Sequence, residues 1–365
     1  MPRSRLLVSL VSAALIAVAC GDDGADDAAT PTTADTSVTS TTAASATTTT
    51  TTTTTTTEPP AAEPGADPAE VRLTTIEVGE FVFDARVAGP DDGELVFLLH
   101  GFPSTSDQWR LEIPVLGEAG YRVVAPDQRG YSAGARPPDV ADYRIELIAD
   151  DVAAMADVLG VDRFHVVGHD FGGAAVWSIA DRHADRLLSV TAISTPHPAA
   201  LVASVADPDS DQADRSSYVD TFVREGSELI FLANDAQTLK ALYAGQGLSE
   251  EEMEPQLAVL NDADAMIAAL NWYRASFNES GFQVGPSTVP TMFIWSTGDD
   301  FLGPDPARAT GDFVTGGYRF EIIADVDHWV PERAAGIVNP LLLDFLADPG
   351  AIAPGESMTT EHPAP

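Results

Sequence analysis

The chain has a single cysteine, Cys20, and only 19 lysine and arginine residues against 56 aspartate and glutamate residues. One thiol excludes an intramolecular disulfide and a thiolate metal cluster, so the folded part must rely on its hydrophobic core. The formal net charge of −37 argues against nucleic acid as a partner, because such a surface repels phosphates. Such acidity favours solubility or adaptation to a saline habitat as its explanation, rather than a particular function.

Residues 1–20 begin with two positive charges, Arg3 and Arg5, and continue as an apolar run that ends at Cys20. The run is short for a membrane span and is typical of a secretory signal. The small residues before Cys20 resemble the lipobox of bacterial lipoproteins, which implies lipidation of that cysteine. The alternative is an ordinary signal peptide with an incidental cysteine. We expect an exported lipoprotein, anchored to the cell membrane on its extracellular face through the lipid alone.

Three further regions follow. Residues 21–70 are rich in Thr, Ala, Asp and Pro and have no apolar period, which predicts a disordered linker. Residues 71–348 are long enough for one folded domain. Within them, residues 199–287 look helical and contain no obvious buried strand, so we interpret them as an inserted lid. The tail, residues 349–365, is predicted to be disordered.

The folded region alternates apolar runs with helical patterns. Runs that are apolar throughout and end in polar residues or glycine predict strands buried on both faces, as in a parallel sheet. Alternation with helices predicts an α/β fold with helices on both sides of a mostly parallel sheet. The expected helices span 144–160 and 172–184, and the expected strands span 95–101, 121–130, 164–170, 187–196, 289–299 and 318–328.

Polar residues stand where several of these strands end, namely His100, Asp127, Asp170, Asp299 and His328. In a parallel sheet, the carboxyl ends of the strands meet at one edge, where ligands bind. Each residue taken alone is more often a turn or capping residue. Together they indicate an active site.

Asp170 lies in the run VVGHDFGG, which passes from an apolar strand through a tight turn into a helix. Gly168 and Gly172 allow such a turn, and the frame is that of a nucleophile elbow with aspartate in place of serine. Attack by a carboxylate on a saturated carbon gives a stable alkyl ester of Asp170, which water must then hydrolyse. The simpler alternative is that Asp170 only caps the following helix.

A base and its acidic partner follow in chain order. His328 comes after the last predicted strand and is suited to activate water. Asp299 and Asp300 follow the preceding strand, and one of them is expected to orient the imidazole, with Asp299 preferred and Asp300 the alternate. The backbone N–H groups of Phe102 and Phe171 are expected to form the oxyanion hole. His100 is more simply a structural hydrogen-bonding residue than a base.

Together these motifs resemble the epoxide hydrolase and haloalkane dehalogenase branch of the α/β-hydrolase fold. The resemblance covers residues 75–346 and rests on the motifs HGFP, PDQRGYSAGARP, VVGHDFGG, STPHP, NWYR and DHWVPE. It implies Asp170 as nucleophile, His328 as base, Asp299 as acid and HGFP as the oxyanion loop.

The resemblance also separates the two substrate classes. Family lid tyrosines donate a proton to an opening epoxide, and Tyr273 matches one of them. Thr221 stands where the second is expected, and Tyr218 is the alternative, although packing is its simpler role. Departing halides are bound by side-chain N–H donors at the places that hold Phe102 and Phe171 here, which argues against a dehalogenase.

The most favoured function is therefore epoxide hydrolysis to a diol, acting on a small molecule without a metal or organic cofactor. The alternatives are a haloalkane or haloacid dehalogenase and a catalytically degenerate cell-surface binding lipoprotein. A carboxylesterase is disfavoured because Asp170 replaces the serine. The sequence predicts neither the particular substrate nor the oligomeric state.

Overall fold

A computed structural model describes residues 67–277 and 283–365 of the chain. The predicted signal peptide, Cys20 and almost all of the predicted linker lie outside these residues. Within the described part, no helix has both the length and the apolar character needed to cross a membrane.

One nine-stranded sheet runs through the domain in the order β1-β2-β4-β3-β5-β6-β7-β8-β9. The strands are β1 (Arg72–Val78), β2 (Phe81–Ala88), β3 (Leu95–Leu99), β4 (Arg122–Pro126), β5 (Phe164–His169), β6 (Leu187–Ile193), β7 (Thr291–Ser296), β8 (Tyr318–Ile323) and β9 (Ser357–His362). Strands β1 and β2 pair antiparallel, as do β2 and β4, and every later pairing is parallel. The predicted mostly parallel α/β sheet is confirmed, and each predicted strand is present.

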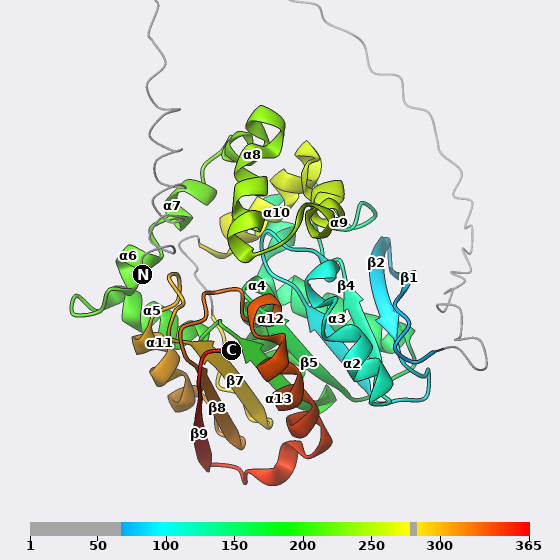
Figure 1. The fold of residues 1–365 in the computed structure, drawn as a ribbon, viewed down its shortest axis with the longest axis vertical. Coiled ribbons are helices and arrows are strands. Elements are labelled where there is room, and N and C mark those ends of the chain that lie inside the picture. The colour runs from blue at the N-terminus through cyan, green and yellow to red at the C-terminus, as the bar shows by residue number, and fades with distance from the viewer. Residues whose placement is uncertain (1–66, 278–282) are drawn as a thin grey trace, which may run out of the picture.

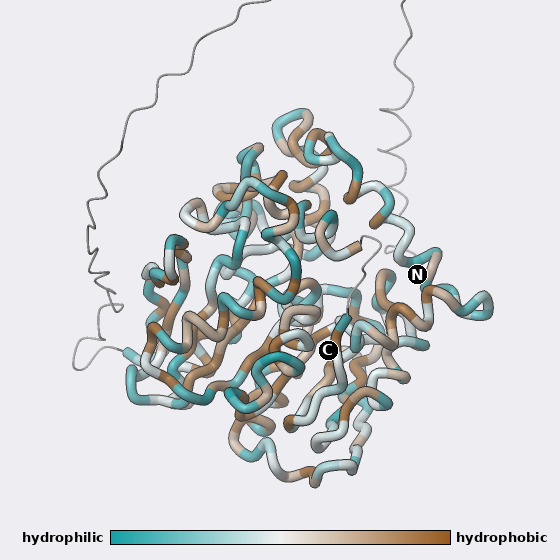
Figure 2. The backbone as a smooth tube through the Cα atoms, turned by 180° about the vertical axis from the view of Figure 1, so that it is seen from behind, coloured by the Kyte–Doolittle hydropathy of each residue, from teal (hydrophilic) through white to brown (hydrophobic). Residues whose placement is uncertain are grey.

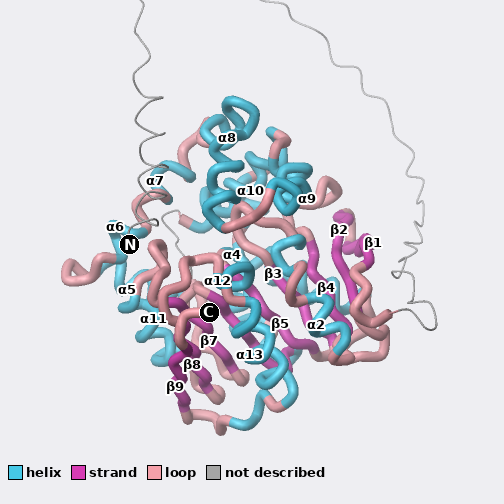
Figure 3. Tube along the Cα trace, viewed as in Figure 1, coloured by secondary structure: helices cyan, strands magenta, loops and turns pink. Residues whose placement is uncertain are grey.

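Both faces of the central strands β3, β5 and β7 are buried, as the uninterrupted apolar runs predicted. In β3, Leu95, Phe97 and Leu99 belong to one hydrophobic cluster, while Val96 and Leu98 belong to a second. Successive side chains of a strand point to opposite faces, so the two clusters are the two sides of the sheet. Helices lie on both sides of the strand layer (Figure 3). Hydrophobic stretches follow the strands and the helices packed on them, whereas outer turns are mostly hydrophilic (Figure 2).

The helices that cover the sheet and its loops are α2 (Ile113–Glu118), α3 (Ile145–Val158), α4 (Phe171–Arg182), α11 (Pro304–Ala309), α12 (Val330–Arg333) and α13 (Ala335–Ala347). Short 3-10 helices are η1 (Ser106–Trp109), η2 (Val140–Tyr143), η3 (Ala184–Arg186), η4 (Thr310–Phe313) and η5 (Pro349–Ala351). Helices α3 and α4 contribute to the cluster on one face, and α2 and α13 contribute to the cluster on the other.

Helices fill the chain between β6 and β7, where the lid is expected. They are α5 (Pro198–Ala206), α6 (Gln212–Arg215), α7 (Val219–Phe222), α8 (Glu228–Gln246), α9 (Glu250–Leu260) and α10 (Ala263–Ser276). Helices α8, α9 and α10 gather at one end of the molecule, beyond the strands (Figure 1).

Buried hydrogen bonds fasten this helical segment to the loops of the sheet. The Thr105 N–H donates to Gln256 Oε1 at 2.6 Å, and the Tyr243 hydroxyl donates to the Pro103 carbonyl at 2.7 Å. The indole N–H of Trp272 donates to the Arg129 carbonyl at 2.7 Å. These contacts place α8, α9 and α10 over the loops that follow β3 and β4.

The structure differs from the sequence-based expectation at the C-terminal tail. Residues 357–362 form β9, which adds in parallel to β8 at the edge of the sheet. The His362 Nε2 lies 2.6 Å from Oε2 of Glu321, a fully buried carboxyl that also pairs with Arg319. The tail was expected to be disordered because its polar, mostly exposed residues show no apolar period. An edge strand needs none, since backbone pairing and the side-chain contact of His362 with Glu321 hold it.

We predict that His362→Ala destabilises the protein measurably. Loss of the imidazole leaves Glu321 Oε2 buried without its partner, which costs about 1–3 kcal/mol in free energy of unfolding. Urea denaturation measures the change, with Glu361→Ala on the exposed side of the same strand as control. Equal stability of the two variants would show that β9 does not stabilise the sheet.

Candidate active site

Three of the predicted site residues meet at one edge of the sheet. Asp170 directly follows β5, Asp299 follows β7 and His328 follows β8. These are parallel strands, so their carboxyl ends lie side by side even though the residues are far apart in the chain. The hydrogen bonds below define their geometry.

The turn at Asp170 has the strained backbone of an elbow. Asp170 has φ 54° and ψ −122° and forms the N-cap of α4. The turn is crowded, because a Cβ atom at Gly172 would lie 2.0 Å from the Leu99 carbonyl oxygen, and one at Gly168 would lie 2.2 Å from the Gly172 carbonyl oxygen. Only glycine fits at these two positions. A positive φ at a non-glycine residue is costly, and such strain is concentrated at functional sites.

His328 connects the two aspartates. Its Nδ1 lies 2.8 Å from Asp299 Oδ2, and its Nε2 lies 3.2 Å from Asp170 Oδ2. Asp299 is held in turn by the backbone N–H groups of Phe301 and Leu302, which donate to Oδ1 at 2.8 Å and 3.0 Å. The contact to His328 Nδ1 is thus made by Asp299, the preferred member of the Asp299 and Asp300 pair.

The charges of this cluster support each other. Burial disfavours a charged imidazole, but the Asp299 carboxylate and the hydrogen bonds to both aspartates outweigh it and raise the pKa of His328 to about 10. Burial likewise opposes ionisation of Asp170, yet the hydrogen bond and charge of His328 lower the pKa of Asp170 below its usual value. The free site therefore holds an imidazolium between two carboxylates.

Two backbone donors converge on Asp170 from the predicted oxyanion-hole positions. The Phe102 N–H donates to Asp170 Oδ1 at 2.9 Å, and the Phe171 N–H also hydrogen-bonds to the carboxylate. The loop approaches closely because residue 101 is glycine, where a Cβ atom would lie 2.3 Å from the Asp170 Cβ. Both donors lie beside the carboxyl carbon that an ester hydrolysis would attack.

The two other polar residues at strand ends have structural roles. The Gln128 N–H donates to His100 Nε2 at 3.1 Å, and His100 Nδ1 lies 3.1 Å from the Gly101 carbonyl oxygen. Burial lowers the pKa of His100 to about 4, so this histidine is neutral and ties two loops together. Asp127 accepts a hydrogen bond from the Ser106 N–H at 2.6 Å.

Aromatic side chains of the lid surround Asp170. The Tyr273 ring of α10 contacts Phe171 and Phe102 edge to face, with centroid distances of 4.7 Å and 5.5 Å. Tyr218, just before α7, lies 6.4 Å from the Tyr273 ring and 5.3 Å from Phe301.

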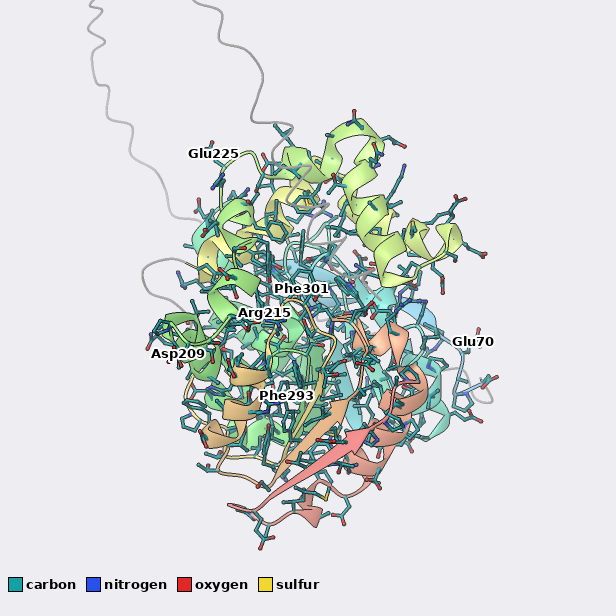
Figure 4. The ribbon with its side chains drawn as sticks, turned by 60° about the vertical axis from the view of Figure 1, so that its left-hand side comes forward. Glu70, Asp209, Arg215, Glu225, Phe293 and Phe301 are labelled. Atoms are coloured by element: carbon teal, nitrogen blue, oxygen red, sulfur yellow. The ribbon has the colours of Figure 1, made fainter. Side chains whose placement is uncertain are left out.

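Phe301 in turn packs on His328, with ring centroids 5.3 Å apart. It lies in the middle of the molecule near Arg215, between the lid helices and the strands (Figure 4). The contacts of Phe301 with both Tyr218 and His328 bring Tyr218 to the site.

Both lid tyrosines are buried phenols that interact electrostatically with Asp170. Burial, followed by the negative charge of Asp170, raises the pKa of Tyr273 and of Tyr218 above the usual value, so both hydroxyls are protonated at neutral pH. Among the described residues, neither hydroxyl has a hydrogen-bond partner in the structure. Each is free to donate a proton to a bound molecule.

Sequence reasoning missed a further group behind His328, made of Gln108, His169 and Glu332. These residues stand inside or beside the quoted motifs, but no periodicity or spacing marks them as partners. Within the described ranges, no group of three or more His, Cys, Asp or Glu side chains is arranged to hold a metal ion.

Comparison with known proteins places this site in a family. The model of the alpha/beta hydrolase fold family matches residues 94–334. The chain is 33% identical to the AB hydrolase superfamily protein YfhM of Bacillus subtilis over 287 residues, which cover 76% of this chain and 98% of that protein. It is 29% identical to epoxide hydrolase A of Mycobacterium tuberculosis over 314 residues, 76% of this chain and 94% of the relative.

Solved structures agree. An epoxide hydrolase of the alpha/beta hydrolases superfamily, from metagenomes of hot environments, matches with a TM-score of 0.66 and 27% identity, over 76% of this chain and 99% of its own. The chain belongs to the α/β-hydrolase fold family. It is an enzyme of that fold that is similar to epoxide hydrolases.

We predict that Asp299→Asn lowers both activity and the pKa of His328. The amide removes the charge that most favours the imidazolium, so burial then dominates and the pKa falls. By analogy with triad lesions, activity should fall about 10²-fold or more. NMR titration of the His328 ring and steady-state kinetics measure the two effects.

Asp300→Asn is the matched control for this prediction. It removes the neighbouring carboxylate but keeps the Asp299 contact to His328, so we expect a much smaller loss. Equal losses in the two variants, or a larger loss for Asp300→Asn, would overturn the assignment of Asp299.

Proposed function

We propose that this enzyme hydrolyses small epoxides to diols through a covalent alkyl ester of Asp170. The observation that carries the proposal is the contact chain from Asp170 through His328 to Asp299, with the Phe102 and Phe171 N–H groups on the same carboxylate. Relatives named epoxide hydrolase support the same reaction class.

In the first step, one Asp170 carboxylate oxygen attacks a ring carbon of the epoxide. The new bond is the carboxylate O–C bond, and the ring C–O bond breaks with its electron pair on oxygen. The developing alkoxide takes the hydroxyl proton of Tyr273, with Tyr218 as the second available donor. A positioned general acid of this kind contributes about 10²–10⁴-fold to the rate.

Ester formation changes the charge on His328. The Asp170 carboxylate is one cause of its raised pKa, and esterification removes that negative charge. The pKa of His328 therefore falls. Its proton passes to the tyrosinate that the first step left, which restores the neutral tyrosine. His328 is then a neutral base, still oriented by Asp299.

In the second step, His328 takes a proton from water while the water oxygen attacks the carboxyl carbon of the ester. The Phe102 and Phe171 N–H groups stabilise the oxyanion that forms on Asp170. Collapse of this intermediate breaks the bond to the alkyl oxygen, which leaves as the diol after protonation by His328. Asp170 is then a carboxylic acid, and it passes its remaining proton to the neutral His328. The carboxylate and the imidazolium of the free site are regenerated, so atoms and charges balance.

The aromatic side chains beside Asp170 favour a substrate with apolar substituents. The available donors favour an epoxide over an alkyl halide. Phenylalanine at positions 102 and 171 offers no side-chain N–H to a departing halide, whereas two phenol hydroxyls are available to an alkoxide. Dehalogenation is the second candidate, and the tests below distinguish it. The assembled triad argues against a purely binding role.

We predict that His328→Gln traps the ester. Alkylation of Asp170 needs only the carboxylate and the proton donor, whereas hydrolysis needs the base, so the intermediate accumulates. Mass spectrometry of peptides that contain Asp170 measures the added mass after incubation with styrene oxide.

Turnover of the wild-type enzyme in heavy-oxygen water provides the control for this experiment. Repeated cycles should place label in the Asp170 carboxyl, because water attacks that carbon. Label found only in the diol after many turnovers would exclude the covalent route.

We predict that Tyr273→Phe slows epoxide opening by about 10²-fold, and that Tyr218→Phe also slows it. Tyr318→Phe is the matched control, because Tyr318 is a buried tyrosine of β8 outside the site whose hydroxyl has no partner among the described residues. If Thr221 replaces a second donor, Thr221→Tyr should raise turnover.

The halide alternative is tested with the same variants. Diol formation from styrene oxide and bromide release from a bromoalkane are measured side by side. Faster bromide release, or a Tyr273→Phe variant as active as the wild type, would favour the dehalogenase.

A further inference from the structure

The side-chain amide of Gln108, in η1, contacts residues of three different segments around the site. It is fully buried. Its Oε1 accepts from the Gly101 N–H at 3.3 Å, and its Nε2 donates to Glu332 Oε1 at 3.1 Å. The same Nε2 lies 2.8 Å from Nδ1 of His169. Gly101 precedes the oxyanion donor Phe102, and His169 precedes Asp170. Glu332 lies on α12, the helix that follows His328.

This set of partners fixes the orientation of the amide. Rotation of the amide by half a turn would face its oxygen to the Glu332 carboxyl and its NH₂ group to the Gly101 N–H. Acceptor would then face acceptor and donor would face donor. Only the orientation described satisfies all three contacts.

The amide in turn fixes the tautomer of His169. Because the Gln108 Nε2 can only donate, His169 Nδ1 must accept, and the ring proton is on Nε2. That Nε2 lies 2.8 Å from the backbone carbonyl oxygen of His328 and donates to it. Burial lowers the pKa of His169 to about 4, so the ring is neutral and this tautomer is kept.

The His328 carbonyl is therefore held from two sides. The Ser194 hydroxyl donates to it at 3.0 Å, and the His169 ring donates to it from the side of the elbow. The backbone of the base is thus tied to the residue that precedes the nucleophile. Because Gln108 sets the tautomer of His169, it determines whether the His169 ring can donate to the His328 carbonyl.

At the other end of the chain of contacts, Glu332 acts as an acceptor. Its Oε2 and both carboxyl oxygens of Glu112 are buried without a hydrogen-bond partner among the described residues. Burial, followed by the nearby Glu332 charge, raises the pKa of Glu112 well above its usual value, and burial raises the pKa of Glu332 to about 7. What Gln108 needs from Glu332 is one acceptor oxygen, which a neutral amide can supply as well.

We propose that Gln108 is a positioning residue for hydrolysis of the ester intermediate, because it holds the oxyanion loop, the elbow and the His328 loop in one arrangement. The inference rests on the proposed function above. Hydrolysis needs the Phe102 N–H, the Asp170 carboxyl carbon and the His328 Nε2 to be placed together. A shift of about 1 Å between such groups can cost 10²-fold in rate.

Alkylation makes a weaker demand on this arrangement. It requires the Asp170 carboxylate and a lid tyrosine, neither of which contacts Gln108. Loss of Gln108 should therefore slow the second step selectively. If Gln108 only stabilised the fold, its loss would lower the rates of both steps in proportion to the folded fraction.

The kinetic test compares Gln108→Leu with Gln246→Leu in single-turnover experiments on styrene oxide. Gln246 is the matched control, a buried lid glutamine whose side-chain oxygen and nitrogen have no partners among the described residues. For Gln108→Leu we expect hydrolysis to slow by about 10-fold or more while alkylation stays within about threefold. The alkyl-enzyme then accumulates, and kcat and KM fall together.

Two variants of Glu332 distinguish its role as a hydrogen-bond acceptor for Gln108 from an effect of its negative charge. Glu332→Gln keeps an acceptor oxygen for Gln108 and should hydrolyse the ester nearly as fast as the wild type. Glu332→Leu removes the acceptor and should resemble Gln108→Leu. Equal slowing of alkylation and hydrolysis in Gln108→Leu, or unchanged hydrolysis, overturns the inference.

An independent test reads the tautomer of His169 without substrate. NMR of protein labelled on its 7 histidines distinguishes the two neutral tautomers from the charged ring. We expect the proton on Nε2 in the wild type and a changed state in Gln108→Leu. A proton on Nδ1 in the wild type overturns the inference. If no epoxide alkylates the wild type, the proposed function fails, while the tautomer still decides whether Gln108 sets this network.

Discussion

A partly buried carboxylate at the tip of a strained turn is the constraint on which the rest of the site depends. The Asp170 side chain is only 14% exposed, and an uncompensated charge there would cost several kcal/mol. Its compensation comes from the His328 ring and the backbone N–H groups of Phe102 and Phe171. Each of these groups belongs to a different strand end. The parallel sheet is the framework that brings them together.

In the proposed mechanism, the same compensation allows one site to perform two opposite tasks. While Asp170 is charged, the imidazole is held as a cation and the nucleophile stays ionised. In the proposed ester state, the cation has lost a partner and the imidazole is available as a base. The proposed change of role depends on the charge of Asp170 and requires no movement of the backbone.

The sequence contained most of what depends on local patterns. Strands buried on both faces are continuous apolar runs, so β3 to β8 were predicted, and the crowded turn at Asp170 is visible in Gly168 and Gly172. Strands β1, β2 and β9 were missed, since they alternate with polar residues or carry no apolar pattern, and β1 and β9 are the edges of the sheet. Contacts such as those of Gln108 arise only when three distant loops meet. The position of Tyr218 likewise depends on its packing against Phe301 rather than on its place in a motif. Lipidation of Cys20 stays a prediction.

The lid is inserted in the chain between Asp170 and its two partners, Asp299 and His328, and this order has a consequence for synthesis. A growing chain makes Asp170 long before His328, which follows 158 residues later. Until then the carboxylate has no imidazole to pair with, and the elbow cannot be buried at low cost. The site can therefore be completed only after the lid has been made. A chain that ends before β8 therefore has an aspartate at position 170 without the imidazole that pairs with it in the complete domain.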